Sequence, residues 1–202
     1  MSGAFLKSVA FGLAVAASIG PIALLIISTA ATGGLRRGCW AALGAALADF
    51  AYALLAFSTG AWILPLLAAE ARAIRIGAAT VLIGFAIAML VRELRPGATH
   101  PGAAGSPARG LLSTFVLTLM NPMTVVMFAG FVPQLPLAGS LATAAWLATS
   151  LFAGSLAIQL AFAVSGRLLG AALPGRGWRR SINLAGAAGI LVFGVAGLFS
   201  SR

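Results

Sequence analysis

The stretch SIGPIALLIISTAATGGLRRGCWAALGAALAD, residues 18–49, contains the two features that decide how this chain folds. Gly20 and Pro21 interrupt a long apolar run. Because proline lacks a backbone donor and clashes with the carbonyl four residues earlier, the helix must kink or break there. Asp49 lies deep inside the next apolar run, where a carboxylate is costly unless it faces the protein interior. A broken helix followed by a buried acid predicts a polar site near mid-membrane.

The composition of the chain is that of an integral membrane protein. Of the 202 residues, 61% are hydrophobic and only 8% are charged, whereas a soluble domain carries about 25% charged residues. Long apolar runs recur along the whole chain, as transmembrane helices require. The net charge of +10 does not indicate nucleic acid, because the basic residues lie in short loops between apolar runs and not on one soluble face. We therefore expect the lipid bilayer, and no nucleic acid, as a partner.

Six apolar runs predict an all-α fold, with six transmembrane helices in a single membrane domain of residues 1–202. The runs cover about residues 5–30, 38–67, 76–91, 110–131, 141–164 and 182–199. The first, third and fifth loops carry nine of the 13 basic residues, and the other side carries four. Because basic residues mark cytoplasmic loops, we expect the odd loops in the cytoplasm and both termini outside.

The two halves of the chain show a weak internal similarity. A shift of 101 residues places Gly20-Pro21 over Asn121-Pro122, and each pair opens an apolar stretch. Three spans in each half would make the halves enter the membrane in opposite senses. The pattern therefore predicts a 3+3 inverted repeat with broken helices 1 and 4, as in many secondary transporters. The repeats would cover about residues 1–95 and 110–202, joined by a polar loop at about residues 96–109.

Asp49 is the first candidate for chemistry. It would exchange a proton or cation, or pair with a substrate amine. The alternative is a structural hydrogen bond to a neighbouring helix or to an arginine. Because the chain contains only three acidic residues and this one lies inside a span, we favour the functional interpretation.

The two breaks are the next candidates for substrate binding. Gly20 and Pro21 would expose backbone amides at the start of a half-helix, which attract a carboxylate. Asn121 would add a side-chain amide beside Pro122. The alternative at each position is a packing kink. Further polar candidates, which more often only bond to a neighbouring helix, are Gln159, Ser18, Ser28, Thr29 and Asn183.

An enzyme is not expected from this set of residues. Cys39 is the single cysteine, so dithiol chemistry within one chain is excluded. His100 lies in a polar loop and faces no nucleophile within a span. Clusters of carboxylate, imidazole and thiolate ligands are missing from the spans. We expect no catalytic residue, no cofactor and no metal site.

Three motifs occur in an order and spacing known from one family. They are Gly20-Pro21-x-x-Leu24-Leu25-Ile26 with Gly33, Gly38, Gly44 and Asp49; Arg75-x-Gly77; and Asn121-Pro122 with Phe128 and Pro133-Gln134. Together they resemble the LysE/RhtB family of bacterial amino-acid exporters, over most of the chain. Met123 stands where that family usually has lysine, and Ile22 where it often has asparagine. These departures bear on which substrate is carried.

The resemblance implies a homodimeric protein of the bacterial inner membrane. It implies export of amino acids or related small solutes, coupled to the proton gradient. Two other functions stay open. An exporter of metal ions or other inorganic solutes would need clustered ligands within the spans. A non-transporting membrane scaffold would show no solute flux.

Overall fold

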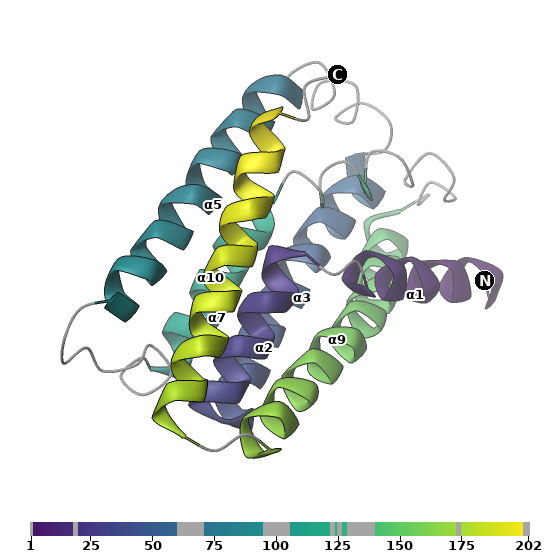
Figure 1. The fold of residues 1–202 in the computed structure, drawn as a ribbon. Coiled ribbons are helices and arrows are strands. Elements are labelled where there is room, and N and C mark those ends of the chain that lie inside the picture. Colours follow the sequence, from purple (N-terminus) through teal and green to yellow (C-terminus); the bar gives the residue numbers. More distant parts are fainter. Residues whose placement is uncertain are drawn as a thin grey trace.

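The computed structural model describes residues 2–17, 20–59, 71–94, 106–121, 124, 127–128, 140–172 and 175–199. Within these ranges the chain forms helices and no strand, in agreement with the predicted all-α class (Figure 1). The helices are α1 (Ser2–Ala17), α2 (Pro21–Gly33), α3 (Leu35–Thr59), α5 (Ala71–Leu94), α7 (Pro107–Leu119), α9 (Leu141–Ala172) and α10 (Arg176–Phe199).

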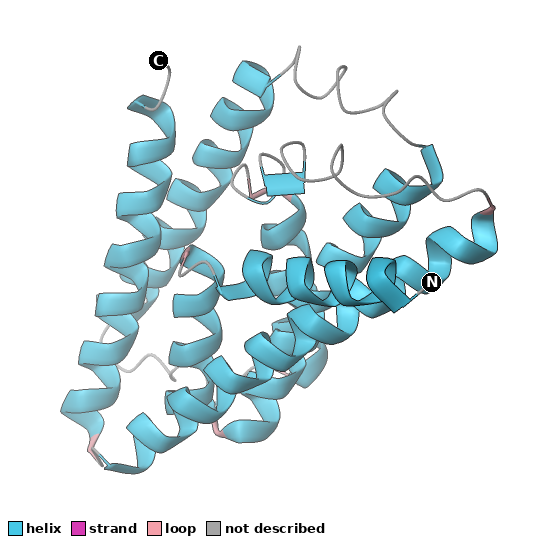
Figure 2. Cartoon of the chain, turned by 90° about the vertical axis from the view of Figure 1, so that its right-hand side faces the viewer, coloured by secondary structure: helices cyan, strands magenta, loops and turns pink. Residues whose placement is uncertain are grey.

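Helix α9 is the hub of the bundle. It packs against α1, α2 and α3, and α3 in turn packs against α7. On the other side of the molecule α10 packs against α2, and α5 packs against α10. The views in Figures 1 and 2 both show α1 lying across the bundle, while the other helices run roughly along it. Asp49 of α3 and Gln159 of α9 therefore belong to two helices in direct contact.

Several helices are long and apolar enough to cross a membrane. Among the described residues, Leu35–Ser58 of α3 and Leu141–Ala172 of α9 qualify alone. Gly3–Ala17 and Pro21–Gly33 qualify together as one span bent by 74°. Shorter apolar stretches lie in α5 and α10, at Leu82–Val91 and Arg180–Val192. The count of six spans and the inverted repeat stay predictions.

The helix break predicted at residues 18–21 is present. Helix α1 ends at Ala17 and α2 begins at Pro21. Pro21 occupies the first turn of α2, where its missing N–H is not needed, and Gly20 has extended backbone angles (φ −129°, ψ −170°). The Leu24 amide donates the first helical hydrogen bond to the Gly20 carbonyl (3.2 Å). Ser18 lies outside the described residues.

The second predicted break also coincides with a helix end. Helix α7 stops at Leu119, and the Asn121 amide closes its last turn on the Thr118 carbonyl (3.1 Å). Pro122 and Met123 lie outside the described residues. Proline at position 122 disfavours helical angles in the residue before it, which accounts for the end of the helix at this point.

Three helix boundaries differ from the sequence prediction. The first loop is reduced to Gly34, whose φ of +87° suits glycine, so Arg36 and Arg37 lie in the first turn of α3. Helix α7 begins at Pro107, which places Arg109 in a helix and not in the predicted loop. Helix α9 continues to Ala172, beyond the predicted end of the fifth span.

Small residues allow the helices to approach closely, as expected in a membrane bundle. A Cβ at Gly12 of α1 would lie 2.1 Å from the Leu151 carbonyl oxygen of α9, and one at Gly166 of α9 would lie 2.3 Å from that of Ile27 in α2. A Cβ at Gly44 of α3 would lie 2.1 Å from the Leu111 carbonyl oxygen of α7. These contacts set the register between the helices.

This packing yields a stability prediction at Gly44. Gly44→Ala should lower the free energy of unfolding by about 1–3 kcal/mol, because the added methyl group would overlap backbone of α7. Gly84→Ala is the matched control, since a Cβ there meets no atom of the described residues within 4 Å and alanine favours the helix. Thermal unfolding of the purified variants in detergent measures both. Equal stability of the two variants would contradict the α3–α7 packing.

Candidate functional site

Asp49 lies in the middle of α3, where it is only 2% exposed. Ser155 of α9 donates a hydrogen bond from Oγ to Asp49 Oδ2 at 2.6 Å. Among the described residues, no lysine or arginine forms an ion pair with this carboxylate. The structural alternative of a partner on a neighbouring helix is therefore realised by a hydroxyl group, which is neutral. A neutral partner leaves the charge of the carboxylate uncompensated.

Gln159 lies one helical turn after Ser155, so the two side chains share one face of α9. Gln159 is 5% exposed, and its Oε1 has no hydrogen-bond partner among the described residues. A buried amide oxygen without a donor costs free energy, so native proteins rarely retain one without a reason. Gln159 therefore offers an unused acceptor next to the Asp49–Ser155 pair.

The start of α2 lies at the level of Gln159. Helices α2 and α9 run side by side, with Ile27 against Gly166 and Ala31 against Gly170. Both pairs have the same offset in residue number, 139. Continuing this register by seven residues towards the break brings Gly20 level with Gln159. The helix break and the buried polar residues of α9 thus lie at one height in the bundle.

The N-terminus of α2 has backbone donors without side-chain caps. Gly20 provides no capping group, and Pro21 has no N–H. The amides of Ile22 and Ala23, in the first turn, have no acceptor within the helix. Both residues are buried, and unpaired amides at a helix start attract a negative charge. Carboxylate binding at Gly20-Pro21 stays a prediction.

Tyr52, which the sequence motifs do not indicate, connects Asp49 with the second break. It follows Asp49 by three residues on α3, and its hydroxyl donates to the Leu119 carbonyl at the end of α7. Its ring lies 5.4 Å from that of Phe128, which in turn lies 5.2 Å from that of Phe11 of α1. Phe128 therefore packs beside Tyr52, which lies one turn after Asp49 on α3.

The predicted site residues thus divide into three groups. Gly20 and Pro21 begin α2 at the level of Gln159 on α9, and Asp49 is hydrogen-bonded to Ser155, one turn before Gln159. Asn121 lies at the end of α7, half-buried, and is linked to this group through Tyr52 and Leu119. Ser18 and Pro122 lie outside the described residues.

The structure adds Ser155 and Tyr52 to the site residues predicted from the sequence. The position of Tyr52 in the sequence is enough to make it a candidate, since it is the only tyrosine of the chain and lies within one helical turn of Asp49. Ser155 lies 106 residues from its partner, and finding it requires the α3–α9 register. Among the described residues, no group of three histidine, cysteine or acidic side chains could hold a metal ion.

Most of this sequence matches the model of one protein family. The model of the LysE type translocator family matches residues 13–201. Neither the search of curated proteins nor that of solved structures found a match. The matched range includes the break at Gly20, the Asp49–Ser155 pair, Gln159 and the end of α7.

The Asp49–Ser155 hydrogen bond should contribute measurably to stability. Ser155→Ala removes the donor and should lower the free energy of unfolding by about 0.5–2 kcal/mol. Ser165→Ala is the control on the same helix, because Ser165 is exposed and, among the described residues, its hydroxyl bonds only to the Ala161 carbonyl of its own helix. Denaturation of both variants in detergent compares them. An unchanged stability of Ser155→Ala would show that Asp49 does not depend on this partner.

Proposed function

The chain belongs to the LysE type translocator family, and from that membership we propose that it is a secondary exporter of amino acids or related small solutes. Family membership confirms the resemblance inferred from the motifs around Gly20-Pro21, Asp49 and Asn121-Pro122. It also agrees with a role in transport and not in catalysis. The observation that carries the proposal is the buried Asp49–Ser155 pair beside the break between α1 and α2.

The substrate carboxylate binds at the start of α2 in this proposal. The free amides of the first turn and the positive end of the helix dipole favour a negative group there. Extended backbone at Gly20 keeps the approach to these amides open, since glycine has no side chain. Ile22, where the family often has asparagine, is 7% exposed and packs in an apolar cluster with Leu25 and Ile26. Backbone groups therefore take the place of a side-chain amide.

The substrate ammonium group binds at Gln159 Oε1. This oxygen is buried and accepts no hydrogen bond from the residues that the structure describes. An ammonium group has three donors and no acceptor. Because Gln159 lies level with Gly20 in the register of α2 on α9, one zwitterion contacts both groups in this proposal. Binding would then satisfy a group that is costly in the empty protein.

Asp49 exchanges the proton that couples transport. Ser155 is suited to both states of the acid, because a hydroxyl donates to a carboxylate and accepts from a protonated carboxyl group. The pair therefore stays hydrogen-bonded whether or not Asp49 carries a proton. A carboxyl group inside a span, paired only with a neutral group, is the type of residue that relays protons in transporters.

The two breaks serve as the points of movement. Helix α1 crosses the bundle while α2 lies within it, so the chain changes direction by 74° next to the site. The hydrogen bond from the Tyr52 hydroxyl to the Leu119 carbonyl connects α3 with the end of α7 at the second break. Rocking of one half against the other around this point would open the site to each side in turn.

The arrangement in the membrane follows from the charge distribution and the family. We place the protein in the bacterial inner membrane as a homodimer, with the odd loops in the cytoplasm and both termini outside. Arg36 and Arg37, at the start of α3, then mark the cytoplasmic end of the bundle. A transport assay separates this proposal from an exporter of inorganic solutes and from a scaffold without transport activity.

Asp49→Asn should abolish coupling. The amide cannot exchange a proton, so pH-gradient-driven efflux of a labelled amino acid from proteoliposomes should fall by about tenfold or more. Asp49→Glu, which retains the carboxyl group, should keep part of the driven efflux. Size-exclusion chromatography checks that each variant is folded. Full pH-driven efflux by Asp49→Asn would show that another group carries the proton.

Gln159→Leu should separate stability from function. Leucine has a similar size and removes the unpaired oxygen, so the variant should be more stable than the original chain by about 1 kcal/mol. The same change should raise the KM for efflux by about tenfold, since one charge-assisted hydrogen bond to the substrate is lost. A residue with only a structural role would show the reverse, with lower stability and an unchanged KM.

A further inference from the structure

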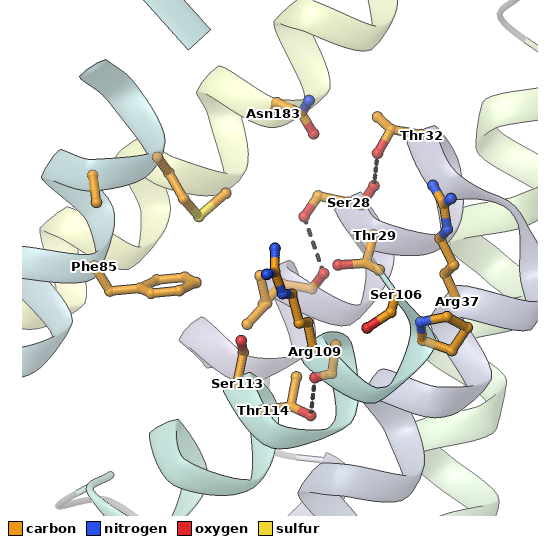
Figure 3. A pocket seen from close by; sticks show the side chains of 15 residues that line it. Ser28, Thr29, Thr32, Arg37, Phe85, Ser106, Arg109, Ser113, Thr114 and Asn183 are labelled. Carbon is orange, nitrogen blue, oxygen red and sulfur yellow. Dashed lines mark hydrogen bonds between the residues drawn. The ribbon is translucent and has the colours of Figure 1, made fainter. Parts of the chain in front are cut away.

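A second polar region lies on the opposite face of α2 from the site described above. It is a cavity of about 280 Å³, which is close to the smallest sites that hold small molecules. Figure 3 shows it between α2, the first turns of α3 and α7, and the helices α5 and α10. Residues 25, 28, 29 and 32 of α2 face this cavity, whereas Ile27 and Ala31 face α9.

The cavity is separate from the Asp49 site. Arg37, which lines it, precedes Asp49 by 12 residues on α3, which corresponds to about 18 Å along a helix. Ser106 and Arg109 also line it and are exposed, so the cavity is reached from the surface near the start of α7. It therefore lies at the end of the bundle that carries Arg36 and Arg37.

One side of the cavity provides donors for an anion. The guanidinium group of Arg109 extends into the space between Phe85 and Thr29 (Figure 3), and within the described part of the chain it makes no ion pair or hydrogen bond. The hydroxyl groups of Thr29 and Ser113, also in the lining, are likewise unpaired among the described residues. Arg37 adds a second positive charge. A carboxylate matches this set, since a guanidinium group binds it through two parallel hydrogen bonds.

The other side of the cavity provides acceptors. Ser28 Oγ donates its proton to the Leu25 carbonyl (3.0 Å), and Thr32 Oγ1 donates to the Ser28 carbonyl (2.8 Å). Because each proton is already used, these oxygens have only lone pairs left for a ligand. Asn183 of α10 lies on the same side (Figure 3). An ammonium group, which only donates, fits these oxygens.

Apolar side chains complete the lining. Leu25 of α2 and both Phe85 and Met89 of α5 line the cavity. A ligand with a charged end and an apolar part would bury that part against them. The lining thus combines donors, acceptors and an apolar wall in a volume suited to one amino acid.

We propose that this cavity is a second binding site of the exporter, which takes up an amino acid with an apolar side chain, its carboxylate on Arg109, before it reaches the Asp49 site. The inference rests on the proposed function for the identity of its ligand. The groups that define the site are the Arg109 guanidinium group and the hydroxyl groups of Thr29 and Ser113, which are unpaired within the described part of the chain, together with the apolar wall. In the orientation inferred above, the cavity faces the cytoplasm, from which an exporter takes its substrate.

The test measures ligand protection within the cavity itself. Ala88, a lining residue outside the proposed contacts, is changed in the full-length protein by Ala88→Cys, together with Cys39→Ala. The rate of maleimide labelling is then measured with L-leucine, with 3-methylbutylamine, which lacks the carboxylate, and with 4-methylpentanoate, which lacks the amine. Short-chain phosphatidylglycerol tests a lipid headgroup as an alternative anion. Ser165→Cys, at an exposed position of α9, reports labelling outside the cavity.

The proposal predicts that leucine slows labelling by about tenfold when its concentration is ten times Kd, since the occupied fraction is protected. The amine should not protect, and 4-methylpentanoate should protect less than leucine. Arg109→Gln should remove protection, whereas Arg167→Gln, an exposed arginine outside the lining, should not. Should Arg109→Gln fail to fold, Thr29→Val removes one donor and should weaken protection.

Three outcomes would overturn the proposal: no protection by leucine, equal protection by the amine, or protection by phosphatidylglycerol alone. Asp49→Asn and Gln159→Leu separate this inference from the proposed function. Both should leave protection unchanged while impairing efflux. Efflux without protection would overturn only the second site, and protection without efflux of any amino acid would overturn the proposed function.

Discussion

The hydrogen bond from Ser155 to Asp49 is the interaction around which the rest of the molecule is arranged. It joins the two longest apolar helices, α3 and α9, through a buried carboxylate. Inside a membrane such a group must face protein and find a donor. The hydroxyl of Ser155 is a donor that adds no charge, and the carboxylate keeps its capacity to bind a proton or a cation. A lysine or arginine in place of Ser155 would stabilise the charged form of Asp49, and the carboxylate would then no longer take up and release a proton.

Close helix packing brings the other parts of the site to this pair. Glycines at the contacts between α9 and both α1 and α2 allow backbone to approach backbone. Because α2 runs beside α9 in constant register, the start of α2 meets the level of Gln159. The same helix then separates two polar regions, with the break and Asp49 on one face and the cavity with Arg109 on the other. A solute passing from one region to the other would follow α2.

Local chemistry explains which parts were predictable from the sequence. A proline kinks or breaks the interior of any helix, and a charged carboxylate raises the free energy of any apolar span. Pro21 and Asp49 are therefore predictable without tertiary information. The helix boundaries at Arg37 and Arg109 were missed because basic residues suggest loops, whereas a glycine with positive φ and a proline at the helix start shortened those loops. Ser155 and the cavity depend on helix register and on segments distant in the sequence. Small residues favour many registers, and periodicity does not choose among them.

The most direct test of this account is efflux of a panel of labelled amino acids from proteoliposomes that contain the wild-type protein, with and without a pH gradient. The account predicts that at least one apolar amino acid leaves the vesicles faster when a proton gradient is applied than when it is absent. Vesicles without protein should show no such difference. If no member of the panel moves under either condition, the protein is not an amino-acid exporter and the role given to Asp49 fails with it.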